Sequence, residues 1–424
     1  MKNIVICCDG TGNEIEEHQS NVLKLFRVLE TGPEAETEQL AFYDTGVGVM
    51  SDSLNWAKFI NKFSLVAGQA VGIGLERNVL DAYRFLIHNY EDGDKIWLFG
   101  YSRGAYTIRV LAGLLHAIGL LKPEHEHLAS YAMTTYKRSE EDATDHRTWR
   151  FRRVMGLKRP PIWFMGCWDT VGSVIVPNLQ KPLQELPHTK SNPSVQNFRH
   201  AMALDERRRM FRLYDWKEGQ YCLTKSLDHI ERLEDYFLET MHNPEIDGET
   251  DLWKKQTCRQ VWFAGVHGDI GGGYPEAESG AAKLTLAWMV KEAERLGLCT
   301  NIDEVEKLVY GRMADPDDPD RTIADPHYRR PSATAALHDS MNFAWRVLEW
   351  LPKAIKPEWK GRGRFLGLYI PRHEPRPTDA TPVFHISIKR RDNYGRWEDR
   401  TKDGRTRPIR FPGKPYAPPN LPEN

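Results

Sequence analysis

The amino-acid sequence predicts an α/β fold with a mostly parallel central sheet flanked by helices. Two observations lead to this prediction. Short apolar runs rich in β-branched and aromatic residues alternate with segments whose apolar residues recur at helical intervals. Each apolar run also ends abruptly at polar residues set among glycines. Alternating strands and helices are typical of right-handed parallel sheets, whose ligands bind at the carboxyl ends of the strands.

Each predicted element follows from its local pattern. Residues 4–8 form a continuous apolar run that suits a strand buried on both faces. Residues 75–90 repeat apolar side chains at helical spacing, and Asp92-Gly93 ends that helix. The predicted strands are residues 4–8, 39–43, 95–100, 161–167 and 260–265. The predicted helices are residues 21–30, 75–90 and 103–119.

The strand-rich part is expected to form one domain with large helical or irregular insertions. We assign residues 1–300 to this domain, with insertions at about 46–74, 124–158 and 177–257, and residues 301–424 to a carboxyl-terminal extension. The first insertion is apolar and glycine-punctuated, which fits a lid or equally a helix packed on the body. The second is charged and expected to be helical. The third is polar and fits a cap. The extension is rich in Pro and Arg, has one predicted helix near residues 335–350, and is expected to pack on the domain.

The composition predicts a soluble protein with a large core. The chain has 424 residues, of which 40% are hydrophobic and 11% aromatic. Its formal net charge of −1 provides no global attraction to nucleic acid or anionic lipid, so any peripheral membrane contact would be local. We find no signal-peptide pattern and no apolar run of about 18 residues, and therefore expect a cytoplasmic protein without a transmembrane segment. The six cysteines lack metal-ligand spacing and are expected to be free, mostly buried thiols.

The clearest motif is Gly100-Tyr101-Ser102-Arg103-Gly104, which stands between a predicted strand and a predicted helix. A serine on such a sharp turn presents its hydroxyl at the carboxyl end of the strand, and the flanking glycines remove Cβ atoms that would clash there. A buried structural serine would explain the glycines but not the hydroxyl between them. We therefore predict that Ser102 is a nucleophile.

A serine nucleophile needs a general base and an acid that orients the base. Hydrolases built on this strand, turn and helix supply them in the chain order Ser, acid, His. Asp169 and His267 occur in that order, each directly after a predicted strand, so the predicted fold is α/β-hydrolase-like with Ser102, Asp169 and His267 as its triad. Asp169 could instead brace a turn, and His385 competes with His267 for the role of base.

Two further loops are expected to complete the site. The oxyanion hole should combine the backbone N–H of Arg103 with an amide of Gly10 or Thr11. Asp9 would then brace the loop that carries those amides. Asp269 could brace the loop around His267, bind a metal or act as the acid, and bracing is its default role. We expect no cofactor, and the sequence leaves a supporting Ca²⁺ site open.

Together these motifs resemble a known family. The similarity rests on five segments: Asp9-Gly10-Thr11-Gly12-Asn13, Tyr43-Asp44-Thr45-Gly46-Val47-Gly48, Gly100-Tyr101-Ser102-Arg103-Gly104-Ala105, Trp168-Asp169-Thr170-Val171-Gly172, and residues 262–274 around His267. The chain is similar to an α/β-hydrolase domain family that includes the catalytic domains of bacterial type VI secretion lipase effectors. The resemblance implies a serine esterase acting on lipids, often phospholipids, with Ser102, Asp169 and His267 as its triad. It also implies delivery by a specialised secretion system.

Three other functions remain open at this point. Asp9-Gly10-Thr11 after the first strand resembles the loop of haloacid-dehalogenase-type phosphohydrolases, although the nucleophilic Asp of that loop would fall at Cys7. A metal-dependent hydrolase could use Asp9, Asp169 and Asp269. The fold could also serve as a non-catalytic binding module. The sequence favours a lipid or another ester as substrate and no nucleic acid, and it predicts no oligomeric state.

Overall fold

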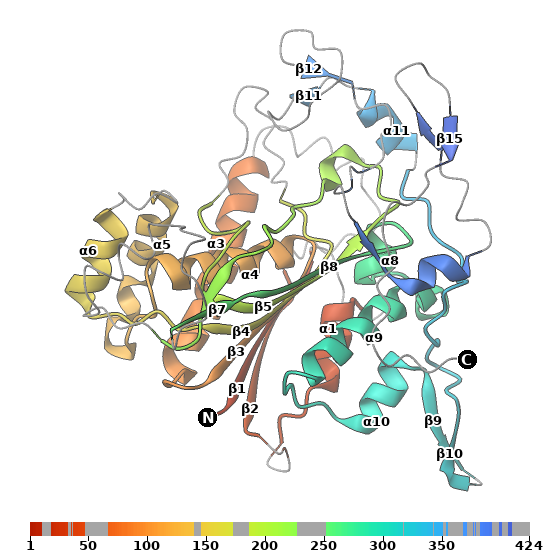
Figure 1. The fold of residues 1–424 in the computed structure, drawn as a ribbon, viewed down its shortest axis with the longest axis horizontal. Helices are drawn as coiled ribbons and strands as arrows, with labels where there is room; N and C mark the ends of the chain where they lie inside the picture. The colour runs from red at the N-terminus through yellow and green to blue at the C-terminus, as the bar shows by residue number, and fades with distance from the viewer. Residues whose placement is uncertain are drawn as a thin grey trace.

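One sheet of seven parallel strands occupies the centre of the computed structural model, counting the residues that the structure describes (Figure 1). Those residues are 1–10, 18–32, 35, 37–46, 67–139, 146–172, 186–226, 252–316, 318–341, 343–350, 353–354, 368–370, 376, 378, 382–391, 398–400 and 406–408. In spatial order the strands are β2 (Gln39–Asp44), β1 (Asn3–Cys8), β3 (Lys95–Tyr101), β4 (Ile162–Trp168), β5 (Val195–Ala203), β8 (Thr257–Phe263) and β13 (Val383–Phe384). The predicted α/β fold class is therefore confirmed.

The order and register of the strands determine where their loops meet. From β1 the chain passes to the edge strand β2 and returns on the other side of β1 at β3, so the winding direction reverses between β1 and β3. In register, Cys8 lies opposite Gly100, and Tyr101 lies opposite Trp168. The loops after β1, β3 and β4 consequently leave the sheet side by side. A ligand site is expected at such a reversal point in an open parallel sheet.

Helices cover both faces of the sheet (Figure 1). One face carries α3 (Ala67–Asn89) and α4 (Arg103–Ala117), with α5 (Ala129–Lys137) and α6 (His146–Met155) outside them. The other face carries α1 (Asn21–Val28) and α9 (Gly280–Glu294), with α10 (Ile302–Glu304) beside α1. The chain thus has the three-layer arrangement in which a parallel sheet is buried on both sides.

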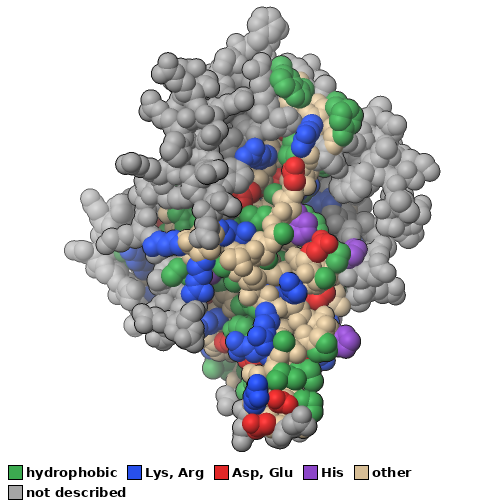
Figure 2. Space-filling view, turned by 90° about the vertical axis from the view of Figure 1, so that its right-hand side faces the viewer, with side chains coloured by type: hydrophobic (Ala, Val, Ile, Leu, Met, Phe, Trp, Pro, Cys, Tyr) green, Lys and Arg blue, Asp and Glu red, His purple; other side chains and the backbone are tan. Residues whose placement is uncertain are grey.

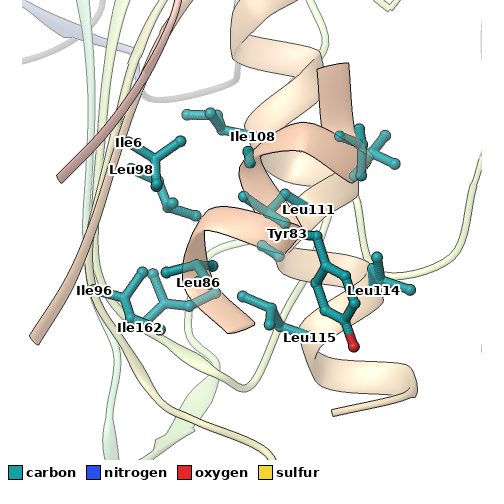
Figure 3. Close-up of a cluster of buried hydrophobic side chains, with 14 of the residues drawn as sticks. Ile6, Tyr83, Leu86, Ile96, Leu98, Ile108, Leu111, Leu114, Leu115 and Ile162 are labelled. Atoms are coloured by element: carbon teal, nitrogen blue, oxygen red, sulfur yellow. The ribbon is translucent and has the colours of Figure 1, made fainter. Parts of the chain in front are cut away.

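Each face of the sheet has its own hydrophobic core. On the first face, Ile6 and Leu98 of the strands pack against Ile108 of α4 and Leu86 of α3 (Figure 3). On the second face, the tilted rings of Phe99 and Phe164 pack with their centroids 5.3 Å apart beneath α1 and α9. The six cysteines have free thiols, as predicted, and four of them are buried. These two cores hold the strand ends in fixed positions.

The structure corrects one predicted insertion. Residues 195–203, expected within the polar insertion 177–257, form β5 in the middle of the sheet. The strand was missed because polar residues interrupt its apolar pattern, and these residues are bonded in the fold. Asn197 donates to the Trp163 carbonyl oxygen at 2.7 Å, and the Arg199 guanidinium pairs with Glu292 at 2.6 Å. The interpretation of this segment as a cap was therefore wrong for β5.

The carboxyl-terminal extension differs from its prediction as well. β13 joins the sheet beside β8, and the helix expected at 335–350 is limited to α11 (Phe343–Glu349). Residues 335–341 have no helix because His338 and Ser340 bond to the main domain instead. A hairpin of β9 (Arg312–Asp315) and β10 (Asp318–Ala324) precedes them. Tertiary contacts thus override the local helical pattern.

The remaining described elements are short. The strand pairs are β6 (Tyr221–Leu223) with β7 (Trp253–Lys255), β11 (Lys353–Ala354) with β12 (Leu368–Tyr369) and β14 (Glu398–Arg400) with β15 (Thr406–Pro408). The 3-10 helices are η1 (Pro123–Leu128), η2 (Arg209–Phe211), η3 (Glu276–Glu278) and η5 (Ile386–Arg390), and η4 (Val305–Val309) is a short π-helix. The predicted helical character of 124–158 is confirmed by η1, α5 and α6. Residues 47–66 of the candidate lid, and residues 177–185 and 227–251 of the candidate cap, lie outside the described residues.

Candidate active site

Ser102 lies in the sharp turn between β3 and α4, and its backbone is strained. Its φ of 56° and ψ of −118° fall in a region that residues other than glycine rarely occupy. The flanking glycines leave no room for side chains. A Cβ on Gly104 would lie 2.1 Å from the Cys8 carbonyl oxygen, and one on Gly100 would lie 2.6 Å from the Ala105 Cα. The turn therefore packs against the end of β1 and holds Ser102 at the carboxyl edge of the sheet.

His267 faces Ser102 from the loop that follows β8. It begins the short helix α8 (His267–Gly271), and its Nε2 lies 2.8 Å from the Ser102 Oγ. The rings of Tyr101 and Phe211 contact the imidazole at centroid distances of 4.8 and 4.9 Å. The Tyr101 hydroxyl also donates a hydrogen bond to the His267 carbonyl oxygen at 3.2 Å. These contacts restrict the orientation of the imidazole ring.

Asp169 completes a chain of three hydrogen-bonded side chains. It directly follows β4, is fully buried and, like Ser102, has a positive φ, here 41°. Its Oδ2 lies 2.5 Å from the His267 Nδ1. Its Oδ1 accepts a hydrogen bond from the Ala203 amide at 2.8 Å. The Arg376 guanidinium donates to both oxygens, at 2.5 and 3.0 Å. The carboxylate is thus oriented by one backbone amide and one fork-shaped cation.

Burial and charge set the protonation states of this group. Burial disfavours the carboxylate of Asp169, but the Arg376 guanidinium and the hydrogen bond from His267 outweigh it and lower the pKa of Asp169 well below its usual range. Burial also lowers the pKa of His267, and the pull of Asp169 in the opposite direction only partly compensates. Asp169 is therefore ionised at neutral pH and His267 is neutral. This combination suits an imidazole that accepts a proton.

The loop after β1 lies against the Ser102 turn, and Asp9 braces it. Asp9 Oδ2 accepts hydrogen bonds from the hydroxyls of Tyr43, at 2.8 Å, and Ser20, and Oδ1 accepts one from the Gly10 amide at 2.6 Å. The Gly10 amide therefore donates to Asp9 in this structure, and its place in the oxyanion hole stays a prediction. The Thr11 amide lies outside the described residues. The Arg103 amide, at the start of α4, has no acceptor among the described residues.

Asp269 holds the His267 loop in shape and joins it to the extension. Its Oδ2 accepts hydrogen bonds from the backbone amides of Val266, at 3.0 Å, and His338, at 3.2 Å. Its Oδ1 lies 2.6 Å from the His338 Nδ1. The other imidazole nitrogen of His338 lies 3.0 Å from Glu278. Asp269 thus ties the loop around His267 to the extension.

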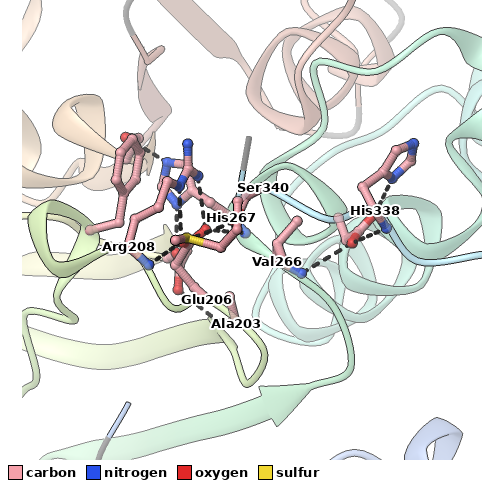
Figure 4. Close-up of polar contacts among 12 residues, drawn as sticks. Ala203, Glu206, Arg208, Val266, His267, His338 and Ser340 are labelled. Atoms are coloured by element: carbon pink, nitrogen blue, oxygen red, sulfur yellow. Dashed lines mark hydrogen bonds and ion pairs between the residues drawn. The ribbon is translucent and has the colours of Figure 1, made fainter. Parts of the chain in front are cut away.

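Glu206 supports His267 from a second direction (Figure 4). It is fully buried, and its Oε2 accepts a hydrogen bond from the backbone amide of His267 at 3.2 Å. The Arg208 guanidinium donates to both of its oxygens, at 2.8 and 2.9 Å, and the Ser340 hydroxyl donates to Oε1 at 3.2 Å. Burial opposes ionisation of Glu206, but Arg208 outweighs it and lowers its pKa. The backbone amide of His267 is therefore held by an ionised carboxylate.

A model of the T6SS, Phospholipase effector Tle1-like, catalytic domain family matches residues 2–292 of the 424. The chain belongs to this Tle1-like family. The match confirms the resemblance predicted from the sequence and includes Ser102, Asp169 and His267. Arg376 and His338 lie beyond it.

The individual proteins that are similar to this Tle1-like chain each match only part of it. An uncharacterised protein of Saccharomyces cerevisiae is 32% identical over 236 residues, which is 53% of the chain and 33% of that protein. The crystal structure of an uncharacterised Pseudomonas aeruginosa protein has a TM-score of 0.38 at 15% identity and covers 74% of this chain and 48% of its own. The Tle1 effector bound to the VgrG spike has a TM-score of 0.33 at 17% identity, with 66% and 52% covered. The chain spans about half the length of these two solved chains and a third of the yeast protein.

His385, the alternative base, and the three carboxylates of the metal-hydrolase alternative are bonded to other groups in the structure. His385 bonds to Ser387 at 2.9 Å and stacks on Phe263, and burial lowers its pKa to about 4. The three carboxylates of the metal-hydrolase alternative, Asp9, Asp169 and Asp269, have separate sets of donors. Within the described part of the chain, no group of three His, Cys, Asp or Glu side chains is arranged to hold a metal ion.

Several supporting residues could not be found from the sequence. Arg376, His338 and Ser340 come from an irregular region without periodicity, far along the chain from the side chains they contact. Glu206 and Arg208 follow β5, and the strand itself was missed. A signal for Glu206 did exist, because Asp205-Glu206 follows an apolar-ended segment in the same way that Asp9 and Asp169 follow theirs.

Proposed function

We propose that this Tle1-like domain is a serine esterase that cleaves acyl esters of phospholipids, with Ser102 as nucleophile, His267 as base and Asp169 as the acid that orients the base. The observation that carries the proposal is the 2.8 Å approach of the His267 Nε2 to the hydroxyl of a strained serine. The membership of the chain in a family of phospholipase effector catalytic domains supports the same chemistry.

The mechanism follows from the protonation states of the three side chains. Neutral His267 takes the hydroxyl proton of Ser102 as the Oγ attacks the ester carbonyl carbon, and the new imidazolium faces ionised Asp169. The tetrahedral intermediate collapses, the ester C–O bond breaks, and His267 returns the proton to the departing alcohol, a lysophospholipid. Water, deprotonated by His267, then releases the acyl group as a fatty acid and restores the Ser102 hydroxyl.

The negative charge that develops on the carbonyl oxygen needs backbone donors. The Arg103 amide is suited to this role because it follows Ser102 directly and has no acceptor among the described residues. With the Gly10 amide donated to Asp9, we assign the second donor to the amide of Thr11. No cofactor takes part in this sequence of steps.

The side chain of Arg103 favours an anionic ester over a neutral one. It is half-buried beside the nucleophile, and burial lowers the pKa of its guanidinium to about 10, so it remains a cation at neutral pH. Among the described residues no hydrogen bond, ion pair or ring contact engages that guanidinium. A phosphate group of the substrate would supply the missing anion, since a guanidinium can bind two phosphate oxygens at once.

α11 offers a surface for contact with the lipid bilayer that holds such a substrate. Phe343, Val347 and Trp350 are 82%, 49% and 55% exposed and recur at the spacing of one helical face. Trp345 points the other way, is buried, and packs on Phe211 beside His267. In Figure 2, hydrophobic side chains gather near the top of the coloured part of the surface, and Figure 1 draws α11 in the upper part of the molecule. We assign this face to a peripheral membrane contact.

Localisation is the remaining part of the proposal. Among the described residues, no helix has the length and hydropathy needed to cross a membrane. The family description names a type VI secretion effector, which supports synthesis in the cytoplasm followed by delivery through such a system.

Steady-state hydrolysis tests the proposal. Wild type, Ser102→Ala and Arg103→Gln are compared on phosphatidylglycerol vesicles and on a soluble p-nitrophenyl ester without phosphate. Ser102→Ala is expected to lose at least about 10⁴-fold in kcat on both substrates with an unchanged Tm. Arg103→Gln should raise KM selectively for the phospholipid. Wild-type activity in folded Ser102→Ala would refute the nucleophile, and equal effects of Arg103→Gln on both substrates would refute the phosphate contact.

The membrane contact is tested with the same two substrates. Trp350→Ser is expected to weaken flotation with vesicles and to lower activity on them, while hydrolysis of the soluble ester stays at the wild-type rate. Arg312→Gln, in the β9–β10 hairpin, is the matched surface control. Unchanged flotation of Trp350→Ser would rule out the assigned face.

A further inference from the structure

Arg376 is a buried cation that reaches the active site from outside the matched family domain. It lies in the extension, 84 residues beyond the end of the match at residue 292, and its side chain is only 1% exposed. Its Nη1 and Nη2 lie 2.5 and 3.0 Å from the two oxygens of Asp169. The same two nitrogens donate to the carbonyl oxygens of Ala203, at 3.0 Å, and Phe211. The guanidinium is thus held in place by two backbone segments and in turn holds Asp169.

A buried carboxylate in the position of Asp169 needs such a partner. Removing an ionised carboxylate from water is strongly unfavourable unless charge and hydrogen bonds compensate. Among the described residues, the other donors to Asp169 are the Ala203 amide and the His267 imidazole, and neither carries a charge at neutral pH. Arg376 supplies the opposite charge, and its planar fork also fixes the plane of the carboxylate.

We propose that Arg376 is a positioning residue of the esterase, which holds Asp169 ionised and oriented toward the His267 Nδ1, so that the carboxyl-terminal extension completes the active site of the family domain. This inference rests on the proposed function, because it assigns a role to a partner of the proposed acid. Arg376 acts through Asp169 and does not contact the substrate. Its loss should therefore lower kcat and leave KM unchanged.

The pH profile separates this role from a merely structural one. In the part of the chain that the structure describes, the ionisable groups around His267 and Asp169 are Tyr101, Glu206, Arg208, His200 and Arg376 itself. Removing the Arg376 cation takes a positive charge away from beside the Asp169–His267 pair, which favours the binding of a proton by the pair. The acid limb of kcat/KM, which reports protonation of His267, should consequently move to higher pH. A variant that only loosened the fold would lower activity without moving this limb.

The experiment compares Arg376→Met, Arg376→Lys and the control Arg346→Met in the full chain, on the soluble p-nitrophenyl ester. Arg346 is a matched control because it lies in the same extension but is exposed and pairs with exposed Asp339. We expect Arg376→Met to lose about 10- to 100-fold in kcat. This is the range found when the hydrogen-bond partners that orient metal-binding side chains are removed. Its KM should stay within error and its acid limb should shift upward. Arg376→Lys should recover part of kcat and keep the wild-type limb, and Arg346→Met should match wild type.

Three results would overturn the inference. They are a folded Arg376→Met with wild-type kcat and pH profile, a change in KM alone, or a loss of kcat with an unmoved acid limb. If Arg376→Met does not fold, Arg376→Lys decides the question, because wild-type kcat in that variant shows that the bidentate geometry is dispensable. Failure of the proposed function is distinguishable, since it would appear as activity in Ser102→Ala whatever Arg376 does.

Discussion

The side chains proposed to react and the side chains that support them come from two regions built in different ways. Ser102 and Asp169 directly follow strands β3 and β4, and His267 follows β8, so the topology of the parallel sheet brings them to one edge. Arg376 and His338 come from the extension, where short elements and extended segments alternate. Their positions depend on their own side-chain bonds, those of Arg376 to Asp169, Ala203 and Phe211 and those of His338 to Asp269 and Glu278.

Two kinds of residue can therefore be distinguished. The course of the backbone brings the first kind to the site, whereas side-chain bonds hold the second kind there. A strand-end residue reaches the site whenever the sheet forms, because neighbouring strands are in register. A residue of the extension reaches the site only if its own side-chain bonds form. We therefore expect large effects on turnover from substitutions at the strand ends and smaller, graded effects from substitutions in the extension.

The largest effect expected at the strand ends beyond Ser102 is that of His267→Ala. It removes the proposed base and should lower kcat by about 10⁴- to 10⁶-fold with little change in KM. His385→Asn is the matched control, since His385 is equally buried but bonds to Ser387. It should stay within about tenfold of wild type, through lost packing only. Similar losses in both variants, measured on the soluble ester, would contradict the assignment of His267.

Most of the parallel sheet could be predicted from the sequence, whereas the contacts of the extension could not. The strand and helix periodicity around residues 4–8, 95–119 and 161–167 located β1, β3, α4 and β4, and the glycine-flanked polar residues marked the strand ends that the structure brings together. β5 was missed because Asn197, Arg199 and His200 interrupt its apolar pattern, although each of them is bonded within the fold.

Residues of the extension had no comparable signal. Arg376 is one of many Arg and Pro residues in an irregular stretch, and its ion pair with Asp169 spans 207 positions of the chain. The predicted helix at 335–350 forms only at α11 for a related reason, because the backbone amide of His338 bonds to Asp269 and cannot join a helix there. Contacts of this kind depend on three-dimensional geometry that local patterns do not encode.

The pH dependence of turnover tests the protonation state of His267, a strand-end residue, and is expected to show an effect of intermediate size. Burial lowers the pKa of His267 below its ordinary value of about 6.5. Because only neutral His267 accepts the proton, kcat/KM should rise with pH through this lowered pKa and be constant at neutral pH. The midpoint, measured between pH 4 and 8 on the soluble ester, should therefore lie below about 6.5. A midpoint above that value would contradict the buried, neutral imidazole.

The smallest effect is expected from His338→Ala in the extension. Burial disfavours the charged imidazole, but the bonds to Asp269 and Glu278 outweigh it and raise the pKa of His338. A raised pKa stabilises the fold fully below the unfolded value of about 6.5, and this contribution is lost as pH rises through the folded value. The Tm difference from wild type should therefore be larger at pH 6 than at pH 9.

Turnover gives the second readout for this variant. kcat of His338→Ala should fall by less than about tenfold, because Asp269 keeps its bond to the Val266 amide. His327→Ala, at an exposed position of the same extension, should change neither Tm nor kcat. A Tm difference that grew with pH would show that the sign of the His338 contribution is wrong.

The most direct test of the account is to look for the acyl-enzyme itself. Wild type and Ser102→Ala are mixed with a phospholipid of known acyl chains, quenched in acid within the first turnovers, digested and analysed by mass spectrometry. The account predicts that the wild-type peptide containing Ser102 gains the mass of one fatty acid less one water, as expected for a serine ester, and that Ser102→Ala shows neither the adduct nor fatty-acid release. Fatty-acid release by Ser102→Ala at the wild-type rate, or an adduct on another residue, would contradict it.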